Sequence, residues 1–227
     1  MPRITTHEPR STLYDAMMRL PIVAYQVILI WRELAAIRGL IAFHPYFGGD
    51  WPFLIMVVAR VSGVIFISAI LLLSIARFRP VGKYANWNPK ITALLGTLFT
   101  YLILLTPRSA SVAFWDSLSS LLILLGTTTA ILAVLDLGRS MSIMPEARRL
   151  VTGGLYARIR HPLYLAEEIA VLGFALQFRN WMAVPILLVH LYFQIRRMDW
   201  EEGILANAFP GYVDYKQRTF RLVPGVY

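Results

Sequence analysis

The chain has 227 residues, of which 57% are hydrophobic and only 15% are charged, and its mean hydropathy is +0.58. This composition excludes a soluble domain of that length and indicates a polytopic membrane protein. The 22 lysines and arginines exceed the 13 acidic residues, an excess expected of cytosolic loops in a membrane protein rather than of a nucleic-acid binder. The chain has no cysteine and only four scattered histidines, so we expect no disulfide and no metal site.

The N-terminal part, residues 1–50, is expected to be an arm followed by a helix. The first 20 residues are polar and lack the apolar core of a signal peptide. Residues 21–43 are apolar but include Arg32, Glu33 and Arg38, which do not share one helical face. Because charges at the centre of a span are costly, the sequence favours an interfacial helix here over a marginal span.

The middle part, residues 51–135, is expected to hold three transmembrane helices. The clearest is residues 51–75, which at about 1.5 Å per residue is long enough to cross a hydrocarbon core of about 30 Å. Its one charged residue, Arg60, either extends to the membrane surface or lines a polar cavity. The other two spans are expected at residues 91–106 and 117–135.

Gly126 and the three threonines that follow it lie inside the last of these spans. Small and hydroxylated residues allow transmembrane helices to approach closely. We therefore expect them to serve helix packing.

The C-terminal part, residues 136–227, is expected to form one integrated unit of a polar connector, a transmembrane hairpin and a final helix. The hairpin helices are residues 163–178 and 181–195, and only Arg179 and Asn180 separate them. A connection that short requires the two helices to run antiparallel.

Basic residues indicate the orientation in the membrane. Fourteen of the 22 lysines and arginines fall in residues 77–90, 136–160 and 196–221, which places these segments in the cytosol. The sequence thus predicts an all-α, polytopic transmembrane protein with about five spans, a C-terminal helical hairpin and a cytosolic C-terminal helix.

The most informative stretch is residues 150–165, LVTGGLYARIRHPLYL. Gly153 and Gly154 allow a tight turn or a close approach to a ligand. Pro162 suits the first turn of a helix, where its missing N–H is not needed, so His161 is expected at the helix start. Polar residues this dense before an apolar run indicate a site at a membrane surface.

Two blocks of sequence resemble the isoprenylcysteine carboxyl methyltransferase and phospholipid methyltransferase superfamily. The first matches its G-x-Y…RHPxY segment through Gly154, Tyr156, Arg160, His161, Pro162 and Tyr164. The second, residues 196–225, is similar to its closing pattern of a Glu-Glu pair, a turn rich in Phe and Tyr, and a terminal Arg-x-x-Pro. Leu155 and Ala157 depart from the usual pattern of the first block.

The resemblance implies a membrane enzyme that uses S-adenosylmethionine as cofactor. It implies that the cofactor pocket is lined by residues of both blocks, namely Gly153, Gly154, Tyr156, Arg160, His161, Tyr164 and Glu202. It further implies catalytic roles for Arg197, which would steer an anionic acceptor, and Glu201, which would hold Arg197 or take a proton.

The length of the hairpin supports a site of this kind. Helices of about 16 residues span roughly 24 Å, less than the roughly 30 Å of hydrocarbon. Glu167 and Glu168 on one helix should therefore lie near the cytosolic leaflet, facing Arg197, Glu201 and Glu202 from the other. Ionisable groups at that depth pair together or line a watered cavity.

The function expected from these observations is methyl transfer from S-adenosylmethionine to a lipid, prenylated or other membrane-associated acceptor. The expected location is an integral membrane protein whose active site faces the cytosol, in the inner or plasma membrane of a prokaryote. The alternative is an NADPH-dependent reductase of the sterol and steroid reductase type, which shares a His-Pro-x-Tyr hairpin. The Glu201-Glu202 pair and Leu163 favour methyl transfer.

Overall fold

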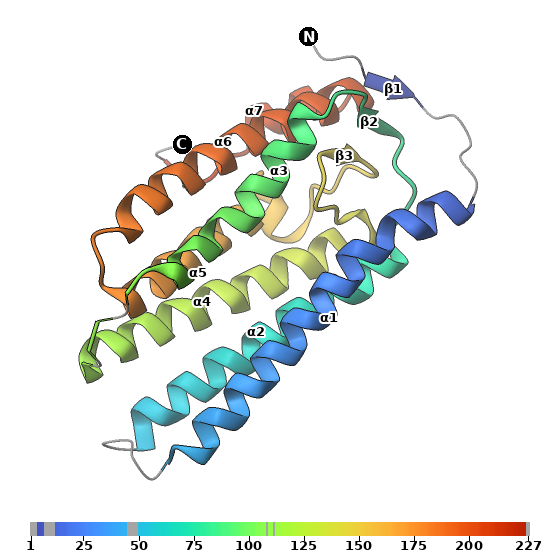
Figure 1. Cartoon of the computed structure of the whole chain (residues 1–227). Helices are drawn as coiled ribbons and strands as arrows, with labels where there is room; N and C mark the ends of the chain where they lie inside the picture. Colours follow the sequence, from blue (N-terminus) through green and yellow to red (C-terminus); the bar gives the residue numbers. More distant parts are fainter. Residues whose placement is uncertain (1–3, 7–11, 45–49, 108, 111, 226–227) are drawn as a thin grey trace.

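The computed structural model describes residues 4–6, 12–44, 50–107, 109–110 and 112–225. Figure 1 shows long helices that lie side by side, with short strands and loops gathered at one end.

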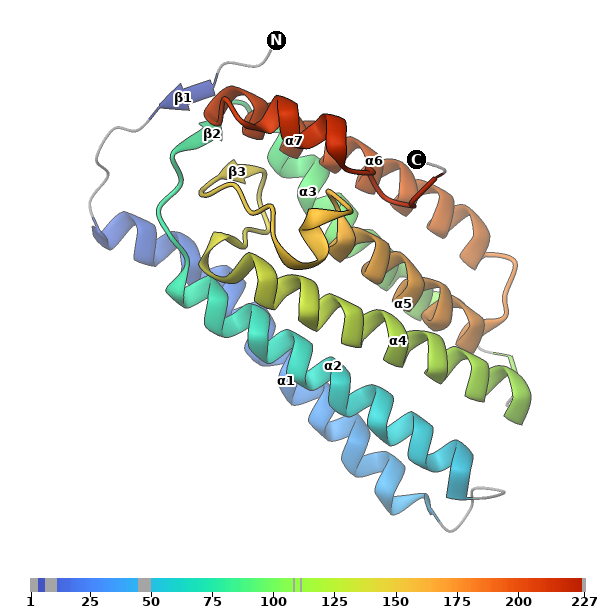
Figure 2. The same cartoon turned by 180° about the vertical axis from the view of Figure 1, so that it is seen from behind.

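Four long helices pack one against the next along the chain's first three quarters. In order of contact they are α1 (Thr12–Ala42), α2 (Asp50–Ala76), α4 (Ala113–Leu137) and α5 (Pro162–Phe178). A second pair packs together beside them, formed by α3 (Asn88–Leu98) and α6 (Ala183–Ala208). The short helix α7 (Tyr212–Arg218) follows α6 at the end where the loops gather (Figure 2).

Three helices among the described residues are long and apolar enough to cross a membrane, namely Leu20–Ala42, Asp50–Ala76 and Ala113–Ser140. The last two agree with the spans expected at 51–75 and 117–135. The first coincides with the segment for which the sequence favours an interfacial helix. Its length, its apolar composition and its packing against α2 favour the alternative, a span.

The span expected at residues 91–106 has a different form in the structure. Helix α3 ends at Leu98, and the chain continues as the 3₁₀ helix η2 (Phe99–Leu105). A 3₁₀ segment of this length is uncommon. This segment is not among the three helices that meet the length and hydropathy requirement within the described residues.

The predicted hairpin is present as α5 and α6. Helix α5 ends at Phe178, where Arg179 adopts a left-handed conformation with φ of 43°, and α6 begins at Ala183. Helix α6 continues past the expected end at residue 195 to Ala208. Its polar second half carries the first residues of the second sequence block.

Close packing of α4 on α5 explains Gly126. A Cβ at this position would lie 2.6 Å from the backbone nitrogen of Ala170 and 2.7 Å from the carbonyl oxygen of Ala166. On the other side of α4, the hydroxyl of Thr127 lies 2.6 Å from that of Ser62 on α2. The expectation that these small and hydroxylated residues serve helix packing agrees with both contacts.

Arg60 forms an ion pair, which is neither of the two roles expected for it, extension to the membrane surface or lining of a polar cavity. Its Nη1 donates to Glu33 Oε2 at 2.8 Å, joining α2 to α1. The sequence does not pair these two residues, because 27 positions separate them. An ionic pair within two apolar helices lowers the cost that each charge would carry alone.

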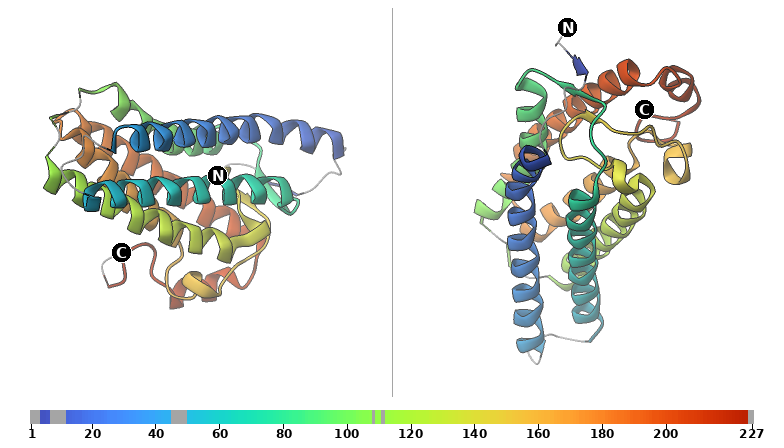
Figure 3. Two further views of the ribbon diagram at one scale, coloured as in Figure 1. Left: turned by 90° about the horizontal axis from the view of Figure 1, so that it is seen from below. Right: turned by 90° about the vertical axis from the view of Figure 1, so that its right-hand side faces the viewer.

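A small antiparallel sheet is a feature that the sequence does not predict. Its strands, in spatial order, are β1 (Ile4–Thr6), β2 (Gly82–Tyr84) and β3 (Glu146–Ala147). The sheet packs on α6 through Tyr84, Ala147 and Ile204, all buried. Sheet and α7 lie at one end of the helices (Figure 3), where they hold the loop before α5 in place.

Candidate active site

A cavity lies at this end of the molecule, between the loop of residues 137–160, the start of α5, the second half of α6, and α7. Its apolar walls include Met144, Leu150 and Ile204. Six of the nine residues predicted for the site line it: Tyr156, Arg160, His161, Tyr164, Arg197 and Glu201. Residues from both sequence blocks therefore meet at one cavity, although they are far apart in the sequence.

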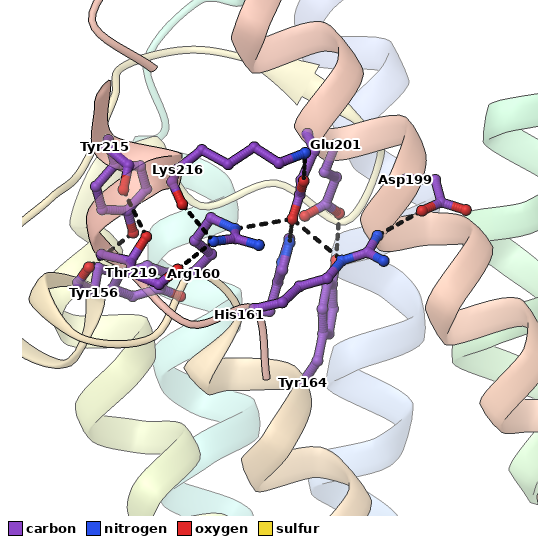
Figure 4. Close-up of polar contacts among 11 residues, drawn as sticks. Tyr156, Arg160, His161, Tyr164, Asp199, Glu201, Tyr215, Lys216 and Thr219 are labelled. Carbon is purple, nitrogen blue, oxygen red and sulfur yellow. Dashed lines mark hydrogen bonds and ion pairs between the residues drawn. The ribbon is translucent and has the colours of Figure 1, made fainter. Parts of the chain in front are cut away.

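Glu202 is the centre of a cluster of charges next to the cavity. Its Oε1 lies 3.0 Å from Arg160 Nε, 3.3 Å from His161 Nε2 and 3.2 Å from Arg221 Nε. Its Oε2 lies 2.7 Å from Lys216 Nζ. Figure 4 shows Arg160, His161 and Lys216 converging on this point of α6. Glu202 itself does not line the cavity, so it contacts the predicted site residues rather than the open space.

Arg197 joins three parts of the structure at the cavity wall. Its Nε lies 3.3 Å from Glu201 Oε1, as the i, i+4 spacing predicts. Its other nitrogens reach Thr97 Oγ1 on α3 at 3.3 Å and the carbonyl oxygen of Ile143 at 2.9 Å. The guanidinium carbon also lies 4.8 Å from the centre of the Tyr164 ring. A planar guanidinium can make all these contacts at once, whereas an ammonium cannot.

Tyr164 connects the two sequence blocks. Its hydroxyl donates a short hydrogen bond to Glu201 on α6. Its ring stacks on that of His161, with centroids 5.4 Å apart and planes 17° apart. His161 occupies the N-cap position of α5 and Pro162 its first turn, as expected. The start of α5 thus places both rings at the cavity wall.

The two glycines of the first block lie outside the cavity lining. Gly154 has φ of +59°, and a Cβ there would overlap the carboxylate of Asp136. The same carboxylate accepts a hydrogen bond from the backbone nitrogen of Leu155 at 2.8 Å. Gly154 therefore permits the loop to close on the end of α4. Gly153 is exposed, and a side chain there would extend into open space.

Further polar pairs continue along the hairpin away from the cavity. Gln194 Nε2 donates to Glu167 Oε2 at 2.9 Å. His190 Nε2 lies 3.0 Å from Glu168 Oε1, close but not aligned for a hydrogen bond. These two pairs join α5 to α6, as do Tyr164 with Glu201 and His161 with Glu202. The sequence led us to expect such pairing of ionisable groups across the hairpin.

Several residues of the site were not identified from the sequence. Tyr212 and Tyr215 of α7 line the cavity, and Tyr215 donates to the carbonyl oxygen of Tyr156 at 2.7 Å. Lys216 and Arg221 pair with Glu202. Arg221 is the arginine of the terminal Arg-x-x-Pro in the second block. That pattern marks the residue, but it does not indicate that Glu202 is its partner.

Burial and charge set the protonation of these groups. Burial raises the pKa of Tyr156 well above its usual range, and raises the pKa of Tyr215 to about 12. Burial alone would raise the pKa of Glu202, but contacts with His161, Lys216 and Arg160 outweigh it and hold that pKa well below the usual range. At neutral pH the tyrosines are therefore hydroxyl donors and Glu202 is an anion.

The lining of the cavity fits a nucleoside-bearing cofactor such as S-adenosylmethionine. Apolar side chains can cover a base, while Arg197, Glu201 and Arg160 offer charged groups to polar ends. The hydroxyl of Tyr212 is buried with no hydrogen-bond partner among the described residues, and such a group normally has one. When bound, this cofactor supplies a methyl group already activated on a sulfonium. Within the described part of the chain, no group of three or more potential ligands is arranged to hold a metal ion.

The long apolar helices indicate an integral membrane protein, and a cavity lined by charged residues lies at one end of it. The model of the phospholipid methyltransferase family matches residues 115–211, from the start of α4 to just past the end of α6. This match agrees with the resemblance of the two sequence blocks to the phospholipid and isoprenylcysteine carboxyl methyltransferases. The match supports a membrane methyltransferase.

Comparison with solved structures finds a similar chain, the eukaryotic intramembrane Ras methyltransferase, isoprenylcysteine carboxyl methyltransferase. The two share 18% sequence identity, and the alignment covers 90% of this chain and 86% of that one, with a TM-score of 0.46. No curated protein matches the sequence.

Proposed function

We propose that this protein transfers the methyl group of S-adenosylmethionine to a lipidic or membrane-associated acceptor, in the manner of an isoprenylcysteine carboxyl methyltransferase. The observation that carries the proposal is the cavity where six predicted residues from two distant blocks meet. This cavity adjoins the end of a helix, Ala113–Ser140, that is apolar enough to cross a bilayer. A soluble, charged cofactor and an apolar acceptor can meet at such a place. In this proposal the cavity lies on the cytosolic side of the membrane.

The residues around the cavity divide into two groups by their contacts. His161, Arg160 and Tyr156 belong to the loop and helix start that the C-terminal part covers, and they suit the cofactor. Arg197 and Glu201 lie on α6, where Arg197 also reaches α3. We assign these two to the acceptor, because a fixed guanidinium recognises a carboxylate or phosphate in two parallel hydrogen bonds. Holding donor and acceptor in line is the main contribution the protein needs to make.

Ligand binding to the purified protein in nanodiscs tests the cofactor. Calorimetry with S-adenosylhomocysteine and, separately, NADPH should give binding for the first and none for the second. Binding of NADPH alone would replace the proposal with a membrane reductase.

Two buried histidines give a matched pair of variants for this test. His161 lines the cavity and pairs with Glu202, whereas His190 pairs with Glu168 outside the cavity lining. Their exposed fractions are 6% and 3%, so both substitutions remove a buried ring. His161→Ala should lose affinity for S-adenosylhomocysteine and His190→Ala should keep it. Equal affinities in the two variants would remove this cavity as the cofactor site.

A further inference from the structure

Residues 219–224, which follow α7, lie across the loop that precedes α5, and we call this segment the C-terminal strap. The backbone nitrogens of Arg160 and His161 donate to the carbonyl oxygens of Phe220 and Arg221, at 2.8 and 3.1 Å. In return the nitrogen of Phe220 donates to the carbonyl oxygen of Arg158 at 3.0 Å. The strap therefore fixes the backbone of two residues that line the cavity.

Side chains reinforce the same junction. The guanidinium of Arg160 donates to the carbonyl oxygens of Lys216, at 2.9 Å, and of Thr219. Figure 4 shows Arg160 between Thr219 and the charged groups of α6. If the strap moved away, Arg160 would lose backbone and side-chain partners together.

Two ion pairs of Arg221, with carboxylates that do not line the cavity, hold the strap to α6. Arg221 Nη2 lies 2.5 Å from Asp199 Oδ1, and its Nε lies 3.2 Å from Glu202 Oε1. The side chain of Arg221 is 14% exposed and that of Asp199 is 39% exposed. Asp199 is absent from the cavity lining, so any effect it has on a ligand in the cavity must pass through its partners.

We propose that Asp199 is a positioning residue: by fixing Arg221 it holds the C-terminal strap on α6, and through the strap it sets the backbone of Arg160 and His161 at the cavity. Arg221 donates its hydrogen bond to Asp199, whereas Glu202 lies within ion-pair distance of its Nε without a hydrogen bond, so Asp199 is the carboxylate that orients this guanidinium. The site is thus completed by the C-terminal strap.

The test uses Asp199→Asn, which keeps the side-chain size and removes the charge. Asp199 also pairs with Arg196 at 3.2 Å on the exposed side of α6. Arg196→Gln therefore removes the other partner of Asp199 and leaves Arg221 in place, which makes it the matched control. Asp199→Glu serves as the conservative variant.

The first measurement is hydrogen exchange of the full-length protein in nanodiscs, followed at the amides of Arg160, His161 and Phe220. Their exchange should be faster by roughly three- to ten-fold in Asp199→Asn, the range expected for a partly exposed charged pair. Arg196→Gln should match the wild type, and Asp199→Glu should restore most of the protection. Wild-type exchange in Asp199→Asn, or equal acceleration in Arg196→Gln, would overturn the proposal.

The second measurement, affinity for S-adenosylhomocysteine, rests on the proposed function. Asp199→Asn should bind it more weakly by a similar factor, with recovery in Asp199→Glu. Unchanged affinity in Asp199→Asn would refute the link from strap to cavity. If the wild type itself does not bind this ligand while exchange still responds to Asp199→Asn, the proposed cofactor is wrong and the role of Asp199 in holding the strap is supported.

Discussion

Replacing Glu202 by Gln should destabilise the whole site end of the molecule. The side chain of Glu202 is 8% exposed and its carboxylate lies within 3.3 Å of four basic side chains. Glutamine keeps the shape but removes the charge, leaving Arg160 and Arg221, which are 10% and 14% exposed, to repel each other. Lys216 is 54% exposed, so water screens its contribution.

Breaking a buried ion pair by removing one partner typically costs about 3–5 kcal/mol. For a chain of this size that loss corresponds to a fall in the melting temperature of about 6–20 °C. Thermal unfolding in detergent, followed by intrinsic fluorescence, measures it. Asp214→Asn, at an exposed residue of α7, is the control and should change the melting temperature by less than about 2 °C.

The pH dependence gives a second check on the same group. Because the pKa of Glu202 is lower in the folded than in the unfolded state, its stabilising effect is complete above the unfolded pKa of about 4.3. That effect is lost as the pH falls toward the folded pKa. The gap between wild type and Glu202→Gln should therefore close below about pH 4.3. A melting temperature of Glu202→Gln equal to the wild type at pH 7 would refute the charge cluster as a stabilising element.

Three further outcomes are expected. Gly154→Ala should weaken S-adenosylhomocysteine binding and lower the melting temperature, because φ is +59° and Asp136 occupies the space of the Cβ; an unaltered variant would show that the loop adapts. Arg197→Lys should keep cofactor affinity but lose turnover by about ten-fold, equivalent to about 1.4 kcal/mol, because lysine lacks the planar fork; full turnover would leave acceptor recognition to other residues. Arg149 lies at the cavity, and Asn180 lies between α5 and α6 at the other end of the hairpin. We expect a cysteine at Arg149 and a cysteine at Asn180 to be labelled from opposite sides of the membrane. Labelling of both from one side would contradict the hairpin topology.

The sequence by itself was sufficient for the membrane class and for most of the helices. Long apolar runs determine spans at 51–75 and 117–135 because only a helix satisfies its own backbone in lipid. The RHPxY block located the start of α5, and the two sequence blocks together located six of the cavity-lining residues. Such features depend on composition and on neighbours within a few residues, which the sequence displays directly.

Only the tertiary structure decided which charges meet. Arg60 and Glu33 are 27 positions apart, Asp199 and Arg221 are 22 apart, and Arg160 and Glu202 are 42 apart. The small sheet likewise joins Ile4–Thr6 to strands that begin at residues 82 and 146. Charged side chains are long and many partners are chemically equivalent, so spacing along the chain does not select among them. That selection is made by the packing of α6 and the C-terminal strap against the loop before α5, which brings the cations of three segments within reach of the carboxylates on α6.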